Sequence, residues 1–137
     1  MNRNDIEQAI NSGEIMLKNL NKALKYAKSA RRWGRVDLFT NGIAGLIKHR
    51  KMDRAKKYVN QAQMFEDRLT AGFKKTEFYL PGMNTPYEKL YHYTDSFAAD
   101  YLAQEDIVDC VNSIAYSIKG INEVLENLRN TLEKVKE

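Results

Sequence analysis

The chain has 137 residues and contains one cysteine, two prolines and seven glycines. A single cysteine, Cys110, excludes an intramolecular disulfide, and we expect it to be a small buried hydrophobic residue. The scarcity of proline leaves room for long helices. No apolar run approaches the roughly 20 residues that cross a bilayer, and the N-terminus lacks the apolar core of a signal peptide. These absences predict a single cytoplasmic domain with no membrane partner.

Strand-like alternation is also missing, and what the chain has instead is a helical repeat near its C-terminus. Apolar residues follow one another in steps of three and four, which is the spacing of a coiled-coil seam. Such a narrow apolar stripe requires a partner helix. The repeat consists of Val111, Ile114, Ile118, Ile121, Leu125, Leu128, Leu132 and Val135.

A second repeat with the same spacing lies near the N-terminus and predicts a helix over about 4–31. Asn4 or Asp5 can cap its first turn, because a short side-chain acceptor satisfies a free backbone N–H. The two repeats have similar lengths, so the simplest fold packs the first helix against the last. This second repeat consists of Ile6, Ile10, Gly13, Leu17, Leu20, Leu24 and Ala27.

Two shorter helices are predicted between these ends, over about 35–49 and 52–79. Gly34 is expected to be the end of the first helix or a tight joint, and the apolar phase is expected to reset near 49–51. Ile43 and either Leu46 or Ile47 should face inward on the first short helix. The second should end before Pro81, with its buried stripe formed by Met52, Ala55, Val59, Ala62, Leu69 and Phe73.

The last part of the chain predicts helices over about 86–103 and 105–136, which are either continuous or separated by a kink. Thr85, Pro86 and Glu88 have the spacing of a capping box with proline at the first helical position. Taken together, the patterns predict an all-α fold. Residues 1–137 should form one elongated helical bundle with long, coiled-coil-like N- and C-terminal helices.

Charge is distributed unevenly along the chain. Residues 18–57 contain 13 basic and two acidic residues (13 − 2 = +11), whereas residues 88–137 contain five basic and ten acidic ones (5 − 10 = −5). Opposite signs suggest intramolecular complementarity first and an external polyanion second. The candidate polyanion contacts are Lys18, Lys22, Lys25, Arg32, Arg50, Lys51, Arg54 and Lys57.

Nucleic acid is one class of partner that such a basic helical face could bind, through phosphates and without sequence readout. Platforms for single strands also need aromatic residues among the cations. The aromatic-rich stretch at 87–101 lies in the acidic half, so the sequence does not predict that mixture. We therefore expect a solvated basic face, partly neutralised by the acidic last helix.

Metal binding and catalysis have weak signals. Glu88, His92 and Asp95 could share one helical face, but a dinuclear bundle site needs Glu-x-x-His on two helices. The other histidine, His49, lies among cations. Asp37 and His49 could meet Asp95 and Asp100 in the bundle as acid/base groups, yet no nucleophile or phosphate-loop motif accompanies them. We expect a protein that is not an enzyme and has no cofactor.

Two stretches of the chain have distinctive polar motifs. The first is Trp33-Gly34-Arg35-Val36-Asp37, followed by Gly42, Gly45 and Lys48-His49; the second is Asp95 followed by Asp100-Tyr101 and Gln104. Together they resemble a family of small all-helical bacterial proteins of unknown function. The resemblance implies an all-helical bundle with long terminal helices and no particular activity. It also singles out a set that would form a polar lock or a binding site: Trp33, Asp37, His49, Asp95, Asp100 and Gln104.

Three functional hypotheses follow. The first is a helical interaction or scaffold protein that self-associates, with a dimer favoured, because the two long helices exceed what the middle helices can cover. The second is a nucleic-acid-associated protein that uses the basic 18–57 face. The third is a small-ligand or metal-binding bundle.

Overall fold

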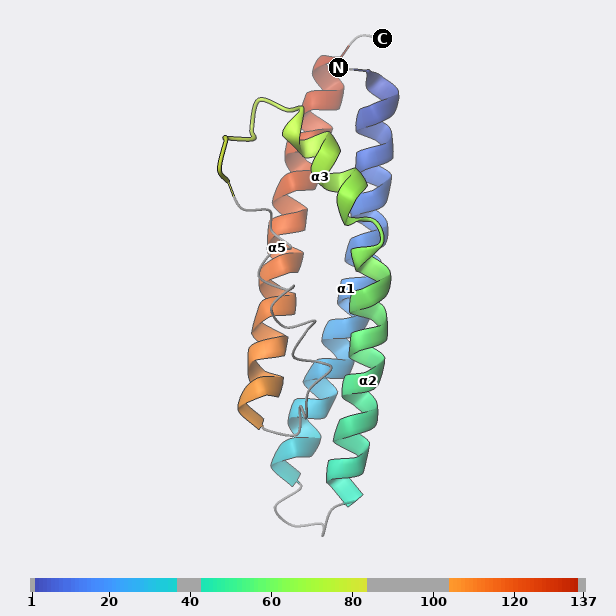
Figure 1. The fold of residues 1–137 in the computed structure, drawn as a ribbon, viewed down its shortest axis with the longest axis vertical. Coiled ribbons are helices and arrows are strands. Elements are labelled where there is room, and N and C mark those ends of the chain that lie inside the picture. The colour runs from blue at the N-terminus through green and yellow to red at the C-terminus, as the bar shows by residue number, and fades with distance from the viewer. Residues whose placement is uncertain (1, 37–42, 84–103, 136–137) are drawn as a thin grey trace.

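The computed structural model confirms an all-α bundle (Figure 1) and describes residues 2–36, 43–83 and 104–135. Its helices are α1 (Arg3–Val36), α2 (Ile43–Gln63), α3 (Glu66–Lys74) and α5 (Gln104–Lys134). The first and last helices pack against each other, as predicted. They are antiparallel, because Gly13 of α1 lies beside Leu125 whereas Arg31 lies beside Gln104. The helix predicted over 86–103 lies outside the described residues.

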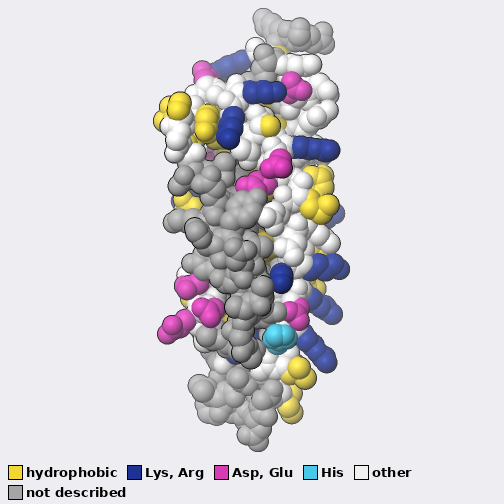
Figure 2. All heavy atoms as spheres, viewed as in Figure 1, with side chains coloured by type: hydrophobic (Ala, Val, Ile, Leu, Met, Phe, Trp, Pro, Cys, Tyr) yellow, Lys and Arg dark blue, Asp and Glu magenta, His cyan; other side chains and the backbone are white. Residues whose placement is uncertain are grey.

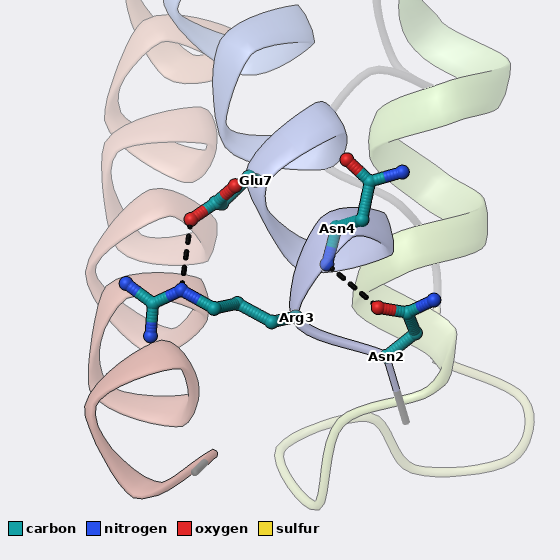
Figure 3. A network of polar contacts seen from close by, with 4 residues as sticks. All are labelled: Asn2, Arg3, Asn4 and Glu7. Carbon is teal, nitrogen blue, oxygen red and sulfur yellow. Dashed lines mark hydrogen bonds and ion pairs between the residues drawn. The ribbon is translucent and has the colours of Figure 1, made fainter. Parts of the chain in front are cut away.

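α1 begins earlier and ends later than its pattern predicted. The cap is Asn2 rather than Asn4 or Asp5: its Oδ1 accepts a hydrogen bond from the backbone N–H of Asn4 at 2.9 Å (Figure 3). An ion pair of 3.0 Å between Arg3 and Glu7 spans the first turn. The predicted end at Gly34 is wrong, because α1 continues to Val36.

α1 is the central helix, since it packs against α2, α3 and α5. Four predicted seam positions are buried, namely Ile6, Gly13, Leu20 and Ala27. At the other three, Ile10, Leu17 and Leu24 are only partly buried, and the residue one position earlier is fully buried instead. Alanines and larger side chains both lie along the buried line, and at Ala9 the backbone of α3 approaches closely. The apolar residues buried along this line are Ile6, Ala9, Met16, Leu20, Ala23, Ala27 and Ala30.

α2 runs without interruption through 49–51, so the predicted phase reset is wrong. The stripe that includes Met52 and Ala55 extends back one turn to Lys48, whose residue is only 5% exposed. Lys48 lies on the buried side of α2, but a search for apolar residues does not select a lysine. The inward face of this part of α2 was therefore predicted at the wrong positions. Ile43, predicted to face inward, is 68% exposed. Of the alternatives Leu46 and Ile47, Leu46 is 56% exposed and Ile47 is partly buried.

The break in the middle of the chain lies between α2 and α3. Phe65 N–H donates to the carbonyl of Ala62 at 3.0 Å, which forms a tight turn. α3 then buries Leu69, Gly72 and Phe73. Its backbone comes so near to α1 that a Cβ at Gly72 would overlap the Cβ of Ala9.

α3 ends at Lys74, five residues before the predicted end at 79. The Thr76 hydroxyl donates to the carbonyl of Phe73 at 2.7 Å and satisfies one free acceptor of the last turn. The chain then turns back, and the Tyr79 ring packs edge-on against Phe73 with 6.0 Å between centroids.

α5 buries most of its predicted seam inside the chain, including Ile114, Ile121, Leu125 and Leu128. Cys110 is 2% exposed, which confirms the expectation of a buried residue. Burial, followed by the nearby charges of Asp106 and Asp109, raises the pKa of its thiol to about 12. None of the described helices is long and apolar enough to span a membrane.

Candidate nucleic-acid interface

The basic residues of α1 and α2 give one side of the bundle a strongly positive surface. Figure 2 shows Lys and Arg side chains projecting in a row along the α2 edge, while acidic side chains gather at the opposite edge near the start of α5. We call the surface formed by the predicted polyanion contacts on these two helices the basic face. It consists of Lys18, Lys22, Lys25, Arg32, Arg50, Lys51, Arg54 and Lys57.

Two tyrosines that the sequence analysis did not select lie within the basic face. Tyr26 of α1 and Tyr58 of α2 stack across the helix pair, with ring centroids 5.8 Å apart and an interplanar angle of 6°. Rings this close to parallel with such a centroid separation are offset, which is a favoured geometry for aromatic pairs. Both tyrosines are partly buried.

Cations from both helices surround the Tyr58 ring. Lys22 of α1 places its Nζ 5.3 Å from the ring centroid, and Lys57 of α2 places its Nζ at 5.9 Å. At exposed sites such cation–π contacts each contribute about 0.5–1 kcal/mol. The ring therefore helps hold two like charges near each other at the surface.

Tyr26 has a similar set of neighbours. Lys51 Nζ lies 5.6 Å and Arg54 Cζ 5.5 Å from its ring centroid. Arg54 Nη1 also donates a hydrogen bond of 3.4 Å to the Tyr26 hydroxyl. This bond is the main reason that the pKa of Tyr26 is lowered; burial opposes the shift, and the charges of Arg54, Lys25 and Lys51 add to it.

The expectation that the chain lacks a mixture of aromatics and cations is therefore wrong. That expectation was based on the aromatic-rich stretch at 87–101 alone, and this stretch lies outside the described residues. Sequence signals for the observed pair did exist. Lys22 precedes Tyr26 by four positions and Arg54 precedes Tyr58 by four, which places each tyrosine on the basic side of its own helix.

The other four predicted contacts, Lys18, Lys25, Arg32 and Arg50, are exposed on the same two helices. Asp53 is the one acidic residue of α2, and its carboxylate lies 3.7 Å from His49 Nε2. In the part of the chain that the structure describes, no ion pair joins the basic face to α5.

Acidic residues elsewhere pair with cations outside the basic face. Glu14 of α1 pairs with Arg129 of α5 at 3.0 Å, and Glu77 pairs with Lys134 at 2.9 Å. Neutralisation of the basic face by the acidic last helix was expected, and across the described ranges it is not observed. Within the residues that the structure describes, the basic face is thus a positive surface that no ion pair joins to α5, and two rings lie at its centre.

Gln104, a member of the second predicted set, lies at a junction of three helices. Its Nε2 donates a hydrogen bond of 3.1 Å to the carbonyl of Arg31 near the end of α1. A Cβ at Gly34 would overlap the Gln104 side chain and lie 3.3 Å from Lys48 Cδ of α2. The absence of a side chain at Gly34 therefore leaves the space that the Gln104 side chain occupies. This explains why a glycine stands inside the helix.

The rest of this set is only partly placed. Trp33 is partly buried in the last turns of α1, and His49 faces Asp53 on its own helix. Asp37, Asp95 and Asp100 lie outside the described residues, as do Glu88 and His92 of the predicted metal site. Within residues 2–36, 43–83 and 104–135, no group of His, Cys, Asp or Glu side chains could hold a metal ion.

Comparisons with protein-family models, with curated proteins and with solved structures found no match to this chain. The resemblance to a family of small bacterial helical proteins thus stays a prediction.

Proposed function

We propose that this protein binds nucleic acid through the basic face of α1 and α2. The observation that carries the proposal is the stacked Tyr26–Tyr58 pair, with four cations within 6 Å of its rings. A protein that neutralises several phosphates releases condensed counterions, so a cluster of this kind favours binding without base-specific contacts. The proposed role is sequence-independent association with a nucleic-acid backbone.

A purely structural role, in which these cations stabilise the fold through ion pairs, explains their clustering less well than polyanion binding does. Surface cations that stabilise a fold are commonly paired with carboxylates, and the described acids of α1 and of the region after α3 pair elsewhere. Holding several like charges together costs free energy in the isolated protein. A bound polyanion removes that cost.

The test is equilibrium binding of the full chain to mixed-sequence DNA and RNA over a range of salt concentrations. The logarithm of the binding constant should fall linearly with the logarithm of the salt concentration. A variant in which glutamine replaces the four ring-contacting cations should bind weakly and reduce the slope by about 3 for a single strand. The replaced residues are Lys22, Lys51, Arg54 and Lys57.

A matched control removes the same charge from elsewhere on the molecule. Glutamine at four exposed cations of α3 and α5 should leave affinity and slope nearly unchanged. An equal loss in both variants would mean that only net charge matters, and an absence of binding at low salt would end the proposal. The control positions are Arg68, Lys74, Lys119 and Lys134.

Self-association is a second proposed function, supported by the exposure of Ile43 and Leu46 one turn apart on α2. Apolar surface left uncovered on the long helices supports self-association only weakly, because α5 buries most of its seam against α1. Light scattering at high micromolar concentration should give a dimer mass, and serine at both positions should give a monomer. A monomer for the unaltered chain would count against this role.

A further inference from the structure

The Tyr26–Tyr58 pair has a chemistry that phosphate binding alone does not require. A row of lysines and arginines is sufficient to attract a duplex or a single strand. Aromatic rings at the centre of such a row hold the neighbouring cations, and they also add attraction for a ligand that presents a flat, apolar face. In nucleic acids, that face is an unpaired base.

A duplex cannot offer such a face along its length, because its bases are stacked on each other and only their edges reach the grooves. A single strand can turn a base outward and stack it on a tyrosine while its phosphates meet nearby cations. At the basic face these two requirements are met within a short distance. The charged atoms of Lys22, Lys51, Arg54 and Lys57 lie 5.3–5.9 Å from a ring centroid.

The pair also spans two helices, which matters for how firmly its rings are held. Tyr26 lies one position before the buried Ala27 of α1, and Tyr58 one position before the buried Val59 of α2. Both tyrosines are partly buried and their rings stack across the two helices, so we expect the rings to need little further ordering on binding. A platform that is already formed loses less conformational entropy when its ligand arrives.

We propose that Tyr26 and Tyr58 form a stacking platform for an unpaired base, so that the basic face prefers single-stranded to double-stranded nucleic acid. This inference rests on the proposed function and names its substrate class. The tyrosines supply the preference for single strands, and the surrounding cations supply the part of the affinity that both forms share.

The experiment compares a mixed-sequence single strand, its duplex and an abasic strand of the same length, each titrated with the full chain at one salt concentration. The unaltered protein should bind the single strand most tightly. Leucine at both tyrosines should weaken single-strand binding by about 5- to 150-fold and leave duplex binding unchanged. Phenylalanine at both positions should preserve the preference, because the rings remain.

The abasic strand keeps the inference testable even if the leucine variant folds poorly. It carries the phosphates and lacks the bases, so the unaltered protein should bind it as weakly as the leucine variant binds the normal strand. Equal affinity of the unaltered protein for the single strand, the duplex and the abasic strand would overturn the platform and leave phosphate binding standing. Absence of binding to all three at low salt would overturn both proposals.

Discussion

Tyr26 is the residue at which the chemistry of the basic face can be followed directly. Its hydroxyl accepts a hydrogen bond from Arg54, and its ring lies near Lys51 and Arg54. A positive neighbourhood favours the phenolate over the neutral phenol. The pKa of Tyr26 is accordingly lower than the ordinary value of 10.0.

Replacing Arg54 with glutamine should raise the pKa of Tyr26 back toward its ordinary value, since both the hydrogen bond and the nearest charge are altered. NMR of tyrosine labelled at Cζ resolves individual phenols, with Tyr26→Phe identifying the signal. Lys74→Gln, which alters a cation near Tyr79 instead, should leave the Tyr26 pKa unchanged. An unchanged pKa in the Arg54 variant would show that the hydrogen bond is not formed in solution.

The sign of the shift also determines how nucleic-acid binding changes with pH. As the pH rises through the lowered pKa, Tyr26 loses its proton and adds a negative charge to the basic face. Binding should therefore weaken at alkaline pH before ordinary tyrosines or lysines titrate. The Tyr26→Phe variant should lack this early loss.

The sequence predicted the charged residues of the basic face but not its two tyrosines. The cations were found because clusters of lysine and arginine are visible in any count of charge. Tyr26 and Tyr58 were missed because they are 32 positions apart, and only packing of α1 on α2 brings them together. Gln104 was singled out by a family resemblance, while its contact with Arg31 depends on the antiparallel register of α1 and α5.

Among the elements, α3 depends most on a single close approach. Gly72 faces Ala9 of α1 with no room for a further methyl group. The obstructing atom is the Cβ of Ala9, which is bonded directly to the backbone and cannot move by changing rotamer. The position of α3 on α1 thus depends on a glycine opposite an alanine.

Gly72→Ala should destabilise the protein by about 1–3 kcal/mol from overpacking, even though alanine favours helix by about 1 kcal/mol. The measurement is the free energy of unfolding in urea. Because the clash involves Ala9, the same substitution made in an Ala9→Gly background should be neutral or stabilising. A loss of similar size in both backgrounds would place the cause elsewhere than at this contact.

Element boundaries show what periodicity can and cannot predict. The pairing of the long helices follows from matching apolar repeats and holds in the structure. Three of the seven predicted seam positions of α1 were misplaced by one residue, and at two of them the buried residue is an alanine, which carries little weight in a hydrophobic pattern. The buried Lys48 made α2 look interrupted. The actual break between α2 and α3, near Phe65, cannot be recognised in the hydrophobic pattern. Buried positions continue with the same helical spacing from Ala62 to Leu69 across the break.

For the whole molecule, the separation of charge implies a cost within the folded state. Cations on α1 and α2 repel one another, while several acids are paired with cations outside the basic face. Exposed ion pairs contribute little to stability, typically 0–1 kcal/mol each. Repulsion at the basic face should therefore dominate the salt dependence of folding.

Sodium chloride should accordingly raise the thermal midpoint of the protein, because ions screen repulsion between exposed charges over about 10 Å at 0.1 M. The variant with glutamine at Lys22, Lys51, Arg54 and Lys57 should show a smaller rise and a higher midpoint at low salt. Calorimetry at two salt concentrations measures both. A midpoint that falls with salt would mean that attractive ion pairs outweigh the repulsion.

The central place of α1 also bears on the order in which the protein assembles during synthesis. The contacts between α1 and α2 are closer in sequence than those between α1 and α5, so less chain entropy opposes their formation. The helix pair can therefore form on the ribosome before α5 has emerged. Since the basic face belongs entirely to α1 and α2, it would be complete while the apolar stripe of α1 that receives α5 is still exposed to the ribosome and its RNA.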